Sequence, residues 1–491
     1  MVKRNSPVGF SHRSGIGIEA FVQDELEAIH LSTLEVLERT GIRVESEEAL
    51  QIFEDAGAKV KRVNGYGLVK LPGYLVEQAI RWAPNTHVFC GRQAQDDFVI
   101  SGRRVGFTAG FGEHVKIVDL ETRQVRNTVK NDLAEITRIQ DALDVISVVE
   151  RAACSGDQPS ISQPLHNFEA MVTNTSKHCF LSFGNRESGS RIIEMAHEVV
   201  GGKEDFDERP FVTPLVSATS PLTLGRNCCD MTVSAARAGL GLGIFVMSLS
   251  GATSPATLAG VIVQHNAETL AAIALAQFTR RGTPCIYCGC STIMDMRLGT
   301  SPVGVPELAL LSITSAKLAQ YYKIPSWVGA CASDSKVSDV QQAYDFSLTA
   351  IPAALAGANL IFGIGAIESA LTFDFAAMIT GAEQAQRIQR LIQGISIDDE
   401  HLSVDLIHEV GPGGNFLSHD HTYKHMYQFS KSSLFDRRNR TDWLDHTRGQ
   451  DLTERAYDEA RRIIQTHKPL SLPEGAPEAM RGIISEFEKS L

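Results

Sequence analysis

The sequence lacks the features that mark membrane, nucleic-acid-binding and nucleotide-binding proteins. It holds no uninterrupted run of about 18 apolar residues, so no membrane-spanning helix is expected. Acidic residues outnumber basic ones by 58 to 46, and the net charge of -12 argues against nucleic-acid binding, which needs a basic surface. Neither GxGxxG nor a P-loop pattern follows any expected strand, which excludes the usual dinucleotide and triphosphate sites.

Cysteine usage gives no sign of a disulfide framework. The nine cysteines are an odd number and are scattered through apolar segments, which is typical of free thiols in a reducing compartment. The basic residues Lys3 and Arg4 have no apolar run behind them, so no signal peptide is visible. We therefore expect a cytoplasmic protein.

The first part of the chain differs in pattern from the rest. Hydrophobic residues make up 43% and charged residues 21%, as in an ordinary globular protein. Helical spacing at 23–40 and a helix start near Ser46 are followed by short strand patterns at 67–70, 87–90, 98–100, 105–108 and 115–118. We expect residues 1–145 to form an α+β cap or dimerisation region.

From about residue 146 onward, short apolar runs alternate with long helical patterns. Eight strand candidates start roughly 30 to 45 residues apart, which favours a closed (β/α)8 barrel over an open sheet. They are 146–153, 179–183, 211–216, 244–249, 285–288, 326–329, 359–363 and a weaker one at 402–407. The expected barrel spans 146–435, with a C-terminal helical extension at 436–491.

Two acidic residues directly follow expected strands, where barrel enzymes place their chemistry. Asp334 precedes a helix, so capping of that helix competes with a catalytic role. Glu368 is less easily explained as a cap, and a role in the pocket is favoured. Asn185 follows the second strand and is a further candidate for substrate binding.

Cysteine and histidine groups raise the possibility of a metal site. Cys285, Cys288 and Cys290 lie close together, but the second CxxC of a structural zinc site is missing, so we favour a core or pocket role. His419 and His421 follow a glycine run and are expected over the barrel mouth, where substrate binding competes with local capping. We expect no metal.

Aromatic residues form only 7% of the chain, yet several fall near strand ends. Most such residues are core residues. A pocket built from several rings would suit a quaternary ammonium, which is attracted to ring faces. The candidates are Phe183, Tyr287, Trp327, Phe362 and Phe416.

Several stretches of the sequence resemble the trimethylamine methyltransferase family, whose wider superfamily includes glycine betaine methyltransferases. The resemblance covers nearly the whole chain and is most specific in the run 250–260, in Asn266-Ala267-Glu268 and in Ser333-Asp334-Ser335-Lys336; weaker support comes from 39–50, 356–359 and 411–417. It implies a β/α barrel that moves a methyl group from an amine to the Co(I) corrinoid (cobalamin) of a separate protein.

The resemblance also bears on substrate and site. Pyrrolysine-bearing members carry that residue around the loop matching Cys331 to Asp334, where this chain has only standard residues. We therefore expect a quaternary amine, with glycine betaine first, in one-carbon metabolism of the methanogenic or acetogenic type. Glu368 or Asp334 would act at the ammonium, with Cys331 beside it, and the enzyme would be a homo-oligomer.

Three alternatives stay open from the sequence. One is a barrel protein that binds betaines without transferring a methyl group. Another is a trimethylamine methyltransferase-like enzyme that uses a different amine. A metal-dependent barrel hydrolase is the third, and it would need the thiols and histidines as ligands.

Overall fold

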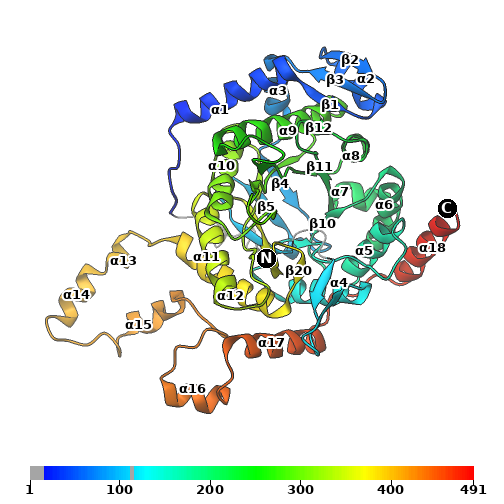
Figure 1. Cartoon of the computed structure of the whole chain (residues 1–491). Coiled ribbons are helices and arrows are strands. Elements are labelled where there is room, and N and C mark those ends of the chain that lie inside the picture. Colours follow the sequence, from blue (N-terminus) through cyan, green and yellow to red (C-terminus); the bar gives the residue numbers. More distant parts are fainter. Residues whose placement is uncertain (1–15, 111–114, 491) are drawn as a thin grey trace.

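The computed structural model describes residues 16–110 and 115–490, and its centre is a closed barrel of eight parallel strands surrounded by helices (Figure 1). The strands follow one another around the barrel in chain order: β6 (Gly106–Ala109), β9 (Val149–Glu150), β10 (Cys179–Ser182), β11 (Val212–Ser217), β13 (Leu242–Phe245), β15 (Cys285–Gly289), β17 (Ser326–Gly329) and β18 (Leu360–Ile364). β18 pairs with β6, and Phe107 of β6 bridges to Ile146 ahead of β9, which closes the ring. The barrel prediction is confirmed.

Helices cover the outside of the barrel, so the strands are buried on both faces. All residues of β15 and β18 are buried, which explains why these segments read as continuous apolar runs. The covering helices are α4 (Lys130–Ala142), α5 (Gln163–Val172), α6 (Arg186–Val200), α7 (Lys203–Glu208), α8 (Arg226–Ala238), α9 (Leu258–Thr279), α10 (Pro306–Tyr322), α11 (Val340–Leu355) and α12 (Phe375–Gln393). Among the described helices α9 alone is apolar and long enough to cross a membrane, but 72% of its most apolar window is buried inside the protein.

The strand expected at 402–407 is wrong. Most of that segment lies in helix α14 (Val404–Val410), and the rest lies directly before this helix. The eighth place in the barrel belongs to β6, from the part of the chain that the sequence assigned to the N-terminal region. The strand itself is predicted, at 105–108, but the sequence places it in the N-terminal region and not in the barrel. The division at 1–145, 146–435 and 436–491 stays a prediction, with the barrel drawing one strand from the first range.

The N-terminal region packs against one side of the barrel. Its elements are α1 (Gln23–Glu35), a π-helical turn (Val36–Thr40), β1 (Ile42–Val44), α2 (Glu47–Asp55), β2 (Lys59–Val63), β3 (Tyr66–Lys70) and α3 (Gly73–Trp82). Helices α1, α2 and α3 contact α9, and β1 pairs in parallel with β12 (Thr223–Leu224) in the connection after β11 (Figure 1). Backbone pairing therefore joins this region to the barrel.

A hairpin closes the barrel at the end opposite the strand C-termini. It consists of β4 (Thr86–Phe89) and β5 (Phe98–Ser101), linked through a short 3-10 turn (Ala94–Asp96). Its side chains Phe89, Phe98 and Ile100 join one hydrophobic cluster with inward-facing barrel residues such as Phe180 and Ile286. The barrel interior is thus filled at this end.

Short strands extend the opposite end, which we call the mouth. They are β7 (Lys116–Val118), β8 (Val125–Asn127), β14 (Leu249–Ser250), β16 (Thr292–Ile293), β19 (Ala366–Ile367) and β20 (Thr372–Phe373). β20 pairs with both β19 and β7, and β14 pairs with β16. These pairings give the mouth loops a fixed arrangement.

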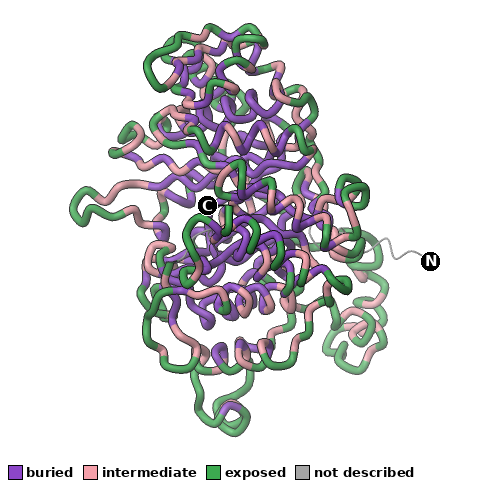
Figure 2. The backbone as a smooth tube through the Cα atoms, turned by 90° about the vertical axis from the view of Figure 1, so that its right-hand side faces the viewer, coloured by how far each residue is buried: buried purple, intermediate pink, exposed green. Residues whose placement is uncertain are grey.

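The C-terminal part begins with a segment that leaves the body and ends with helices that return to it. Figure 1 shows α13 (Asp399–Leu402), α14, α15 (Asp420–His425) and α16 (Arg440–Thr447) extending to the side, with a 3-10 turn at Met426–Gln428. Helix α17 (Leu452–Thr466) packs on α12 and α4, and α18 (Ala476–Lys489) packs on α6. In Figure 2 the buried residues concentrate in the barrel and the adjoining N-terminal region.

Replacing Gly363 by alanine is expected to destabilise the barrel. Gly363 lies in β18 with φ at 122°, and a Cβ there would stand 2.0 Å from the carbonyl oxygen of Ala330 on the neighbouring strand segment. Backbone strain and overpacking together cost about 3 kcal/mol or more, so the melting temperature should fall by about 3 °C or more. Gly482→Ala in α18 is the control, because its Cβ meets nothing within 4 Å. Equal melting temperatures for the two variants would contradict this packing.

Candidate active site at the mouth of the barrel

A cavity of about 420 Å³ opens at the C-terminal ends of the barrel strands. Strand residues form its wall and floor, and two mouth loops form its rim. The lining residues from the strands and their ends are Glu150, Arg151, Phe180, Leu181, Ser182, Leu215, Ser217, Phe245, Met247 and Trp327, and those from the loops are Ser301, Ser369, Ala370 and Leu371. A smaller cavity of about 30 Å³ adjoins it and shares Met247, Ser369 and Ala370.

Aromatic rings dominate the apolar wall of this cavity. The ring centroid of Trp327 lies 4.6 Å from that of Phe180 and 5.8 Å from that of Phe245. Phe362, which lines the smaller cavity, also lies 4.6 Å from Trp327. The three lining rings come from β10, β13 and β17, because inward-facing positions on neighbouring barrel strands fall at similar heights. Such a group of ring faces attracts cations.

Glu150 places a carboxyl group in the same cavity. The residue is 1% exposed, and neither of its carboxyl oxygens has a hydrogen-bond partner. Burial raises the pKa of Glu150 well above the usual range, while the nearby Trp327 indole and the Arg151 guanidinium lower it less. The side chain of Gln140 holds the Glu150 backbone, donating to its carbonyl oxygen at 3.0 Å and accepting from its N–H at 3.2 Å. The backbone of Glu150 is therefore held by Gln140, whereas its carboxyl group, which lines the cavity, is not held by a hydrogen bond.

The predicted loop from Cys331 to Ser335 lies beside the cavity. Cys331 has a φ of 64° and is fully buried, and burial raises the pKa of its thiol. Its N–H donates to Thr349 Oγ1 at 3.2 Å. Its neighbours Ala330 and Ala332, and not Cys331 itself, line the smaller cavity. The loop therefore lies at the end of the barrel where the strands have their C-termini, as the strand spacing predicts.

Asp334 ties three mouth loops together. Its carboxylate accepts from the N–H groups of Val303 and Gly304 at 2.8 and 2.9 Å and from the hydroxyl of Ser369 at 2.8 Å. It does not cap helix α11, because Asp339 takes that position. Three donors around one carboxylate make Asp334 a fixed anchor of the rim, and neither cavity is lined by it.

Glu368 opens a strained stretch of the rim. Glu368, Ser369 and Ala370 have φ angles of 53°, 54° and 66°, a left-handed conformation that costs each non-glycine residue about 1–3 kcal/mol. The stretch is held by donation from Glu368 N–H to Ser335 O at 2.7 Å and from Ser369 N–H to Ser333 O at 3.0 Å. The carboxylate of Glu368 accepts from Thr372 Oγ1 at 2.5 Å. These hydrogen bonds keep the strained stretch, and with it Ser369 and Ala370, in the lining of both cavities.

Of the other residues expected at the site, Trp327 and Phe362 are brought together and six more are not. Phe183 is buried in the outer core near Gly189, and Asn185 caps α6 by accepting from the N–H groups of residues 187 and 188. Tyr287 points into the helix layer, where its hydroxyl donates to Asn266 at 3.0 Å. These three side chains support the barrel wall from outside the cavity.

The remaining expected residues lie on the segment that leaves the body. Phe416 is 42% exposed, and His419 and His421 sit at the start of α15, to the side of the barrel in Figure 1. His421 Nε2 contacts the hydroxyl of Ser403 at 3.1 Å, within the same segment. The glycine run predicts a loop correctly, but its direction away from the mouth depends on tertiary contacts.

Sequence reasoning missed Glu150, Phe180 and Phe245. The signal for Glu150 was present: a charged pair, Glu150-Arg151, interrupts an apolar run whose strand is buried on both faces. A carboxyl group at such a position needs a reason, because burial without a partner is costly. Phe180 and Phe245 lie within their strands and not after them, so a search of strand ends passes over them.

The cysteines do not gather into a metal site in the part of the chain that the structure describes, where no group of three or more potential ligands is arranged to hold a metal ion. Cys288 and Cys290 face the barrel interior, in the cluster that contains Trp327 and Phe362. Burial raises the pKa of both thiols. Their role is to fill the barrel, as the sequence favoured.

The thiols should be unreactive in the native protein. All nine cysteines are buried and free, and reaction requires an accessible thiolate. At about pH 7.5, Ellman's reagent should label fewer than about one thiol per native chain and all nine after unfolding in guanidinium chloride. Fast labelling of Cys288 or Cys290 in the native state, located by mass spectrometry, would show that the barrel interior is open to solvent.

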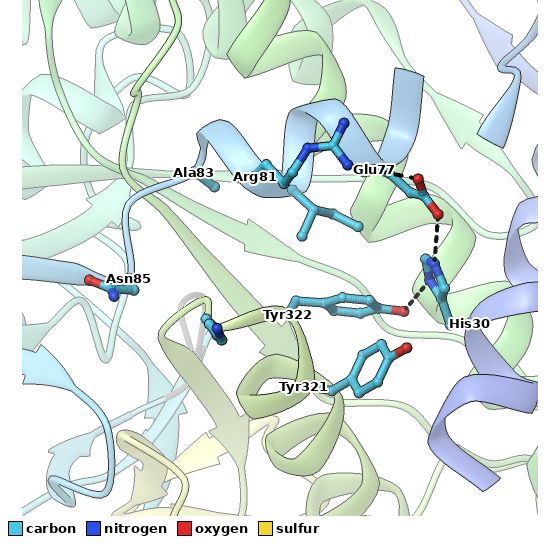
Figure 3. A pocket seen from close by; sticks show the side chains of 9 residues that line it. His30, Glu77, Arg81, Ala83, Asn85, Tyr321 and Tyr322 are labelled. Atoms are coloured by element: carbon cyan, nitrogen blue, oxygen red, sulfur yellow. Dashed lines mark hydrogen bonds and ion pairs between the residues drawn. The ribbon is translucent and has the colours of Figure 1, made fainter. Parts of the chain in front are cut away.

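A second depression, of about 560 Å³, lies outside the barrel between α1, α3 and α10 (Figure 3). His30 Nδ1 contacts the Tyr322 hydroxyl at 3.2 Å, and Nε2 lies 4.0 Å from a carboxylate oxygen of Glu77. Asn266 donates to the same hydroxyl at 2.7 Å. The His30 and Tyr322 side chains in this depression therefore join α1 to the helices of the barrel. This depression is larger than the mouth cavity but has no connection to the strand ends.

These observations define a (β/α)8-barrel protein with a ring-lined, small-molecule cavity at the end of the barrel where such folds bind their ligands. Residues 5–491 match the model of the family described as trimethylamine methyltransferase (MTTB). The chain therefore belongs to the trimethylamine methyltransferase family.

Curated relatives match over nearly the full length. Trimethylamine methyltransferase MttB of Desulfitobacterium hafniense is 45% identical over 481 residues, covering 98% of this chain and 96% of the relative. The MttB protein of Methanosarcina barkeri is 33% identical, covering 100% and 99%. A glycine betaine methyltransferase of Desulfitobacterium hafniense is 29% identical, covering 96% and 97%. The solved hydroxylamine complex of MtmB shares the fold, with a TM-score of 0.50 at 12% identity, covering 95% of this chain and 99% of that one.

Removing the carboxylate of Asp334 should loosen the rim. Asp334→Ala leaves two backbone N–H groups and the Ser369 hydroxyl without their acceptor, which should cost about 2–4 kcal/mol of stability. Glu368→Gln is the comparison, since its side chain keeps an acceptor for Thr372 and should cost less than about 1 kcal/mol. Differential scanning calorimetry measures both. A smaller loss for Asp334→Ala than for Glu368→Gln would contradict the anchoring role.

Proposed function

We propose that this chain transfers a methyl group from a methylated amine to the Co(I) corrinoid of a separate partner protein. The observation that carries the proposal is the cavity at the barrel mouth, where Trp327, Phe180 and Phe245 surround a space of about 420 Å³. Membership of the trimethylamine methyltransferase family supports it. A trimethylated nitrogen fits such a group of rings, whose faces attract its positive charge.

The proposed chemistry needs positioning more than a reactive side chain. The carbon–nitrogen bond breaks, the nitrogen keeps its electron pair and leaves as the demethylated amine, and the methyl carbon is bonded to the cobalt of the partner. The rings hold the ammonium group, and the rim at 369–371 limits its movement. Asp334 and Glu368, the acidic residues expected from the sequence, act in this proposal by holding the rim in place.

The substrate that we place first is a simple methylated amine of the trimethylamine type. The 45% identity to a trimethylamine methyltransferase supports this choice over glycine betaine, whose methyltransferase is 29% identical. Two observations keep a betaine as the second candidate. The loop from Cys331 to Asp334 carries only standard residues, and Arg151 lines the cavity where a betaine carboxylate would need a positive charge.

Methyl transfer can be tested directly with free cobalamin reduced to Co(I). The purified chain is incubated with trimethylamine, glycine betaine, proline betaine or carnitine, and methylcobalamin is followed by absorbance. We expect product with at least one of these amines, and faster transfer when a cognate corrinoid protein replaces free cobalamin. Binding of an amine without methyl transfer to either acceptor would instead favour a betaine- or amine-binding protein.

Trp327→Leu should weaken substrate binding without unfolding the barrel. Loss of the central ring removes a desolvated cation–π contact of about 2 kcal/mol, so KM should rise about thirtyfold. Tyr287→Phe is the matched control on the neighbouring strand, because it removes only a hydroxyl that faces the helix layer. Its KM should equal that of the parent protein. A similar KM for all three proteins would place the substrate elsewhere.

A further inference from the structure

The carboxyl group of Glu150 is the feature of the mouth that the fold does not explain. It is buried, it lines the cavity, and both of its oxygens are without hydrogen-bond partners. Removing a carboxyl group from water without a partner costs free energy, and most buried polar groups in proteins are satisfied. Gln140 already holds the backbone of Glu150, so the side chain is not needed to hold β9.

Few charged or titratable groups lie near the carboxyl group of Glu150. Among the described residues, the charged or titratable groups that act on it are the Arg151 guanidinium and, from β15, the Cys288 and Cys290 thiols. Burial raises the pKa of both thiols, so they are neutral near pH 7. The indole Nε1 of Trp327 is likewise buried without a hydrogen bond of normal geometry, and it lies close enough to the Glu150 carboxyl group to lower the pKa of that group. The remaining residues that line the cavity carry rings, aliphatic chains or small side chains and no charge.

We propose that Glu150 is the counter-ion of the amine substrate, holding a proton while the cavity is empty and releasing it when an alkylammonium ion enters. This inference rests on the proposed function for the identity of the ligand. No covalent bond is made: the carboxyl proton passes to solvent, and the carboxylate faces the cation. Rings alone bind a cation weakly, and a carboxylate within the same low-dielectric space adds a strong attraction.

Proton release gives the binding a defined pH dependence. Because burial raises the pKa of Glu150 well above its usual range, the empty site keeps its proton to a higher pH than an exposed carboxyl group does, and it must lose that proton to bind a cation. Raising the pH therefore favours binding. The affinity should increase about tenfold per pH unit below the pKa of Glu150 and become constant above it.

Calorimetry with a matched pair of ligands tests this. Choline carries a trimethylammonium group, and 3,3-dimethylbutan-1-ol is its uncharged carbon analogue; tetramethylammonium serves as a smaller cation. Titrations in buffers of different ionisation enthalpy count the protons exchanged. We expect both cations to release about one proton, and the alcohol to bind more weakly with no proton release. Cation binding without proton release, tighter binding of the alcohol, or no binding of either cation overturns the proposal.

Variants separate this role from a structural one. Glu150→Gln should abolish the proton release and weaken cation binding at least tenfold, while binding of the alcohol stays the same. Glu268→Gln is the matched control, since Glu268 is also fully buried but accepts from Ser220, Leu222 and Gln264 outside the cavity. It should release a proton on binding as the parent protein does. If Glu150→Gln does not fold, the measurements on the parent chain still decide.

Failure of the inference can be told apart from failure of the proposed function. Methyl transfer from an amine whose binding is independent of pH would overturn the role of Glu150 and leave the methyltransferase proposal standing. Proton-coupled cation binding without methyl transfer to cobalamin or to a corrinoid protein would support Glu150 and remove the proposed activity.

Discussion

A parallel barrel is stable only when every strand edge is paired, and here that requirement is met by β6. This four-residue strand pairs with β18 on one side, and on the other Ser147 N–H donates to Phe107 O at 2.9 Å. Without it, β18 and β9 would be open edges with unpaired backbone groups. The closure also brings Glu150, from the first strand after β6, into the same ring as Trp327 from the seventh.

The rim of the mouth is held by hydrogen bonds, whereas two polar side chains inside the cavity have no hydrogen-bond partner. Asp334 joins three loops through hydrogen bonds, and these bonds balance the cost of the left-handed stretch that begins at Glu368. Polar groups in the rim are thus satisfied, whereas Glu150 and the Trp327 indole inside are not. That contrast is typical of ligand sites, where the surroundings are rigid and the free polar groups face the space for the ligand.

The sequence predicts the barrel well because seven of its strands carry strong apolar runs between helical patterns. It misplaces the eighth, because Leu402, Val404 and Ile407 look apolar enough for a strand, but they lie in the short helices α13 and α14 and are exposed. Trp327 and Phe362 are found among the aromatic residues near the expected strand ends, although both lie inside their strands. Asn185 satisfies its side chain locally by capping α6, and the Tyr287 hydroxyl donates to Asn266 in the helix layer, a contact between residues well separated in sequence.

The hairpin of β4 and β5 closes one end of the barrel. Phe89, Phe98 and Ile100 fill the end opposite the mouth, so in the described part of the chain the ring-lined cavity opens at the mouth, between the rim loops. A corrinoid protein that presents its cobalt to the same opening would cover this route. In the proposed reaction, the amine would enter before the partner docks, and its demethylated product would leave after the partner has withdrawn.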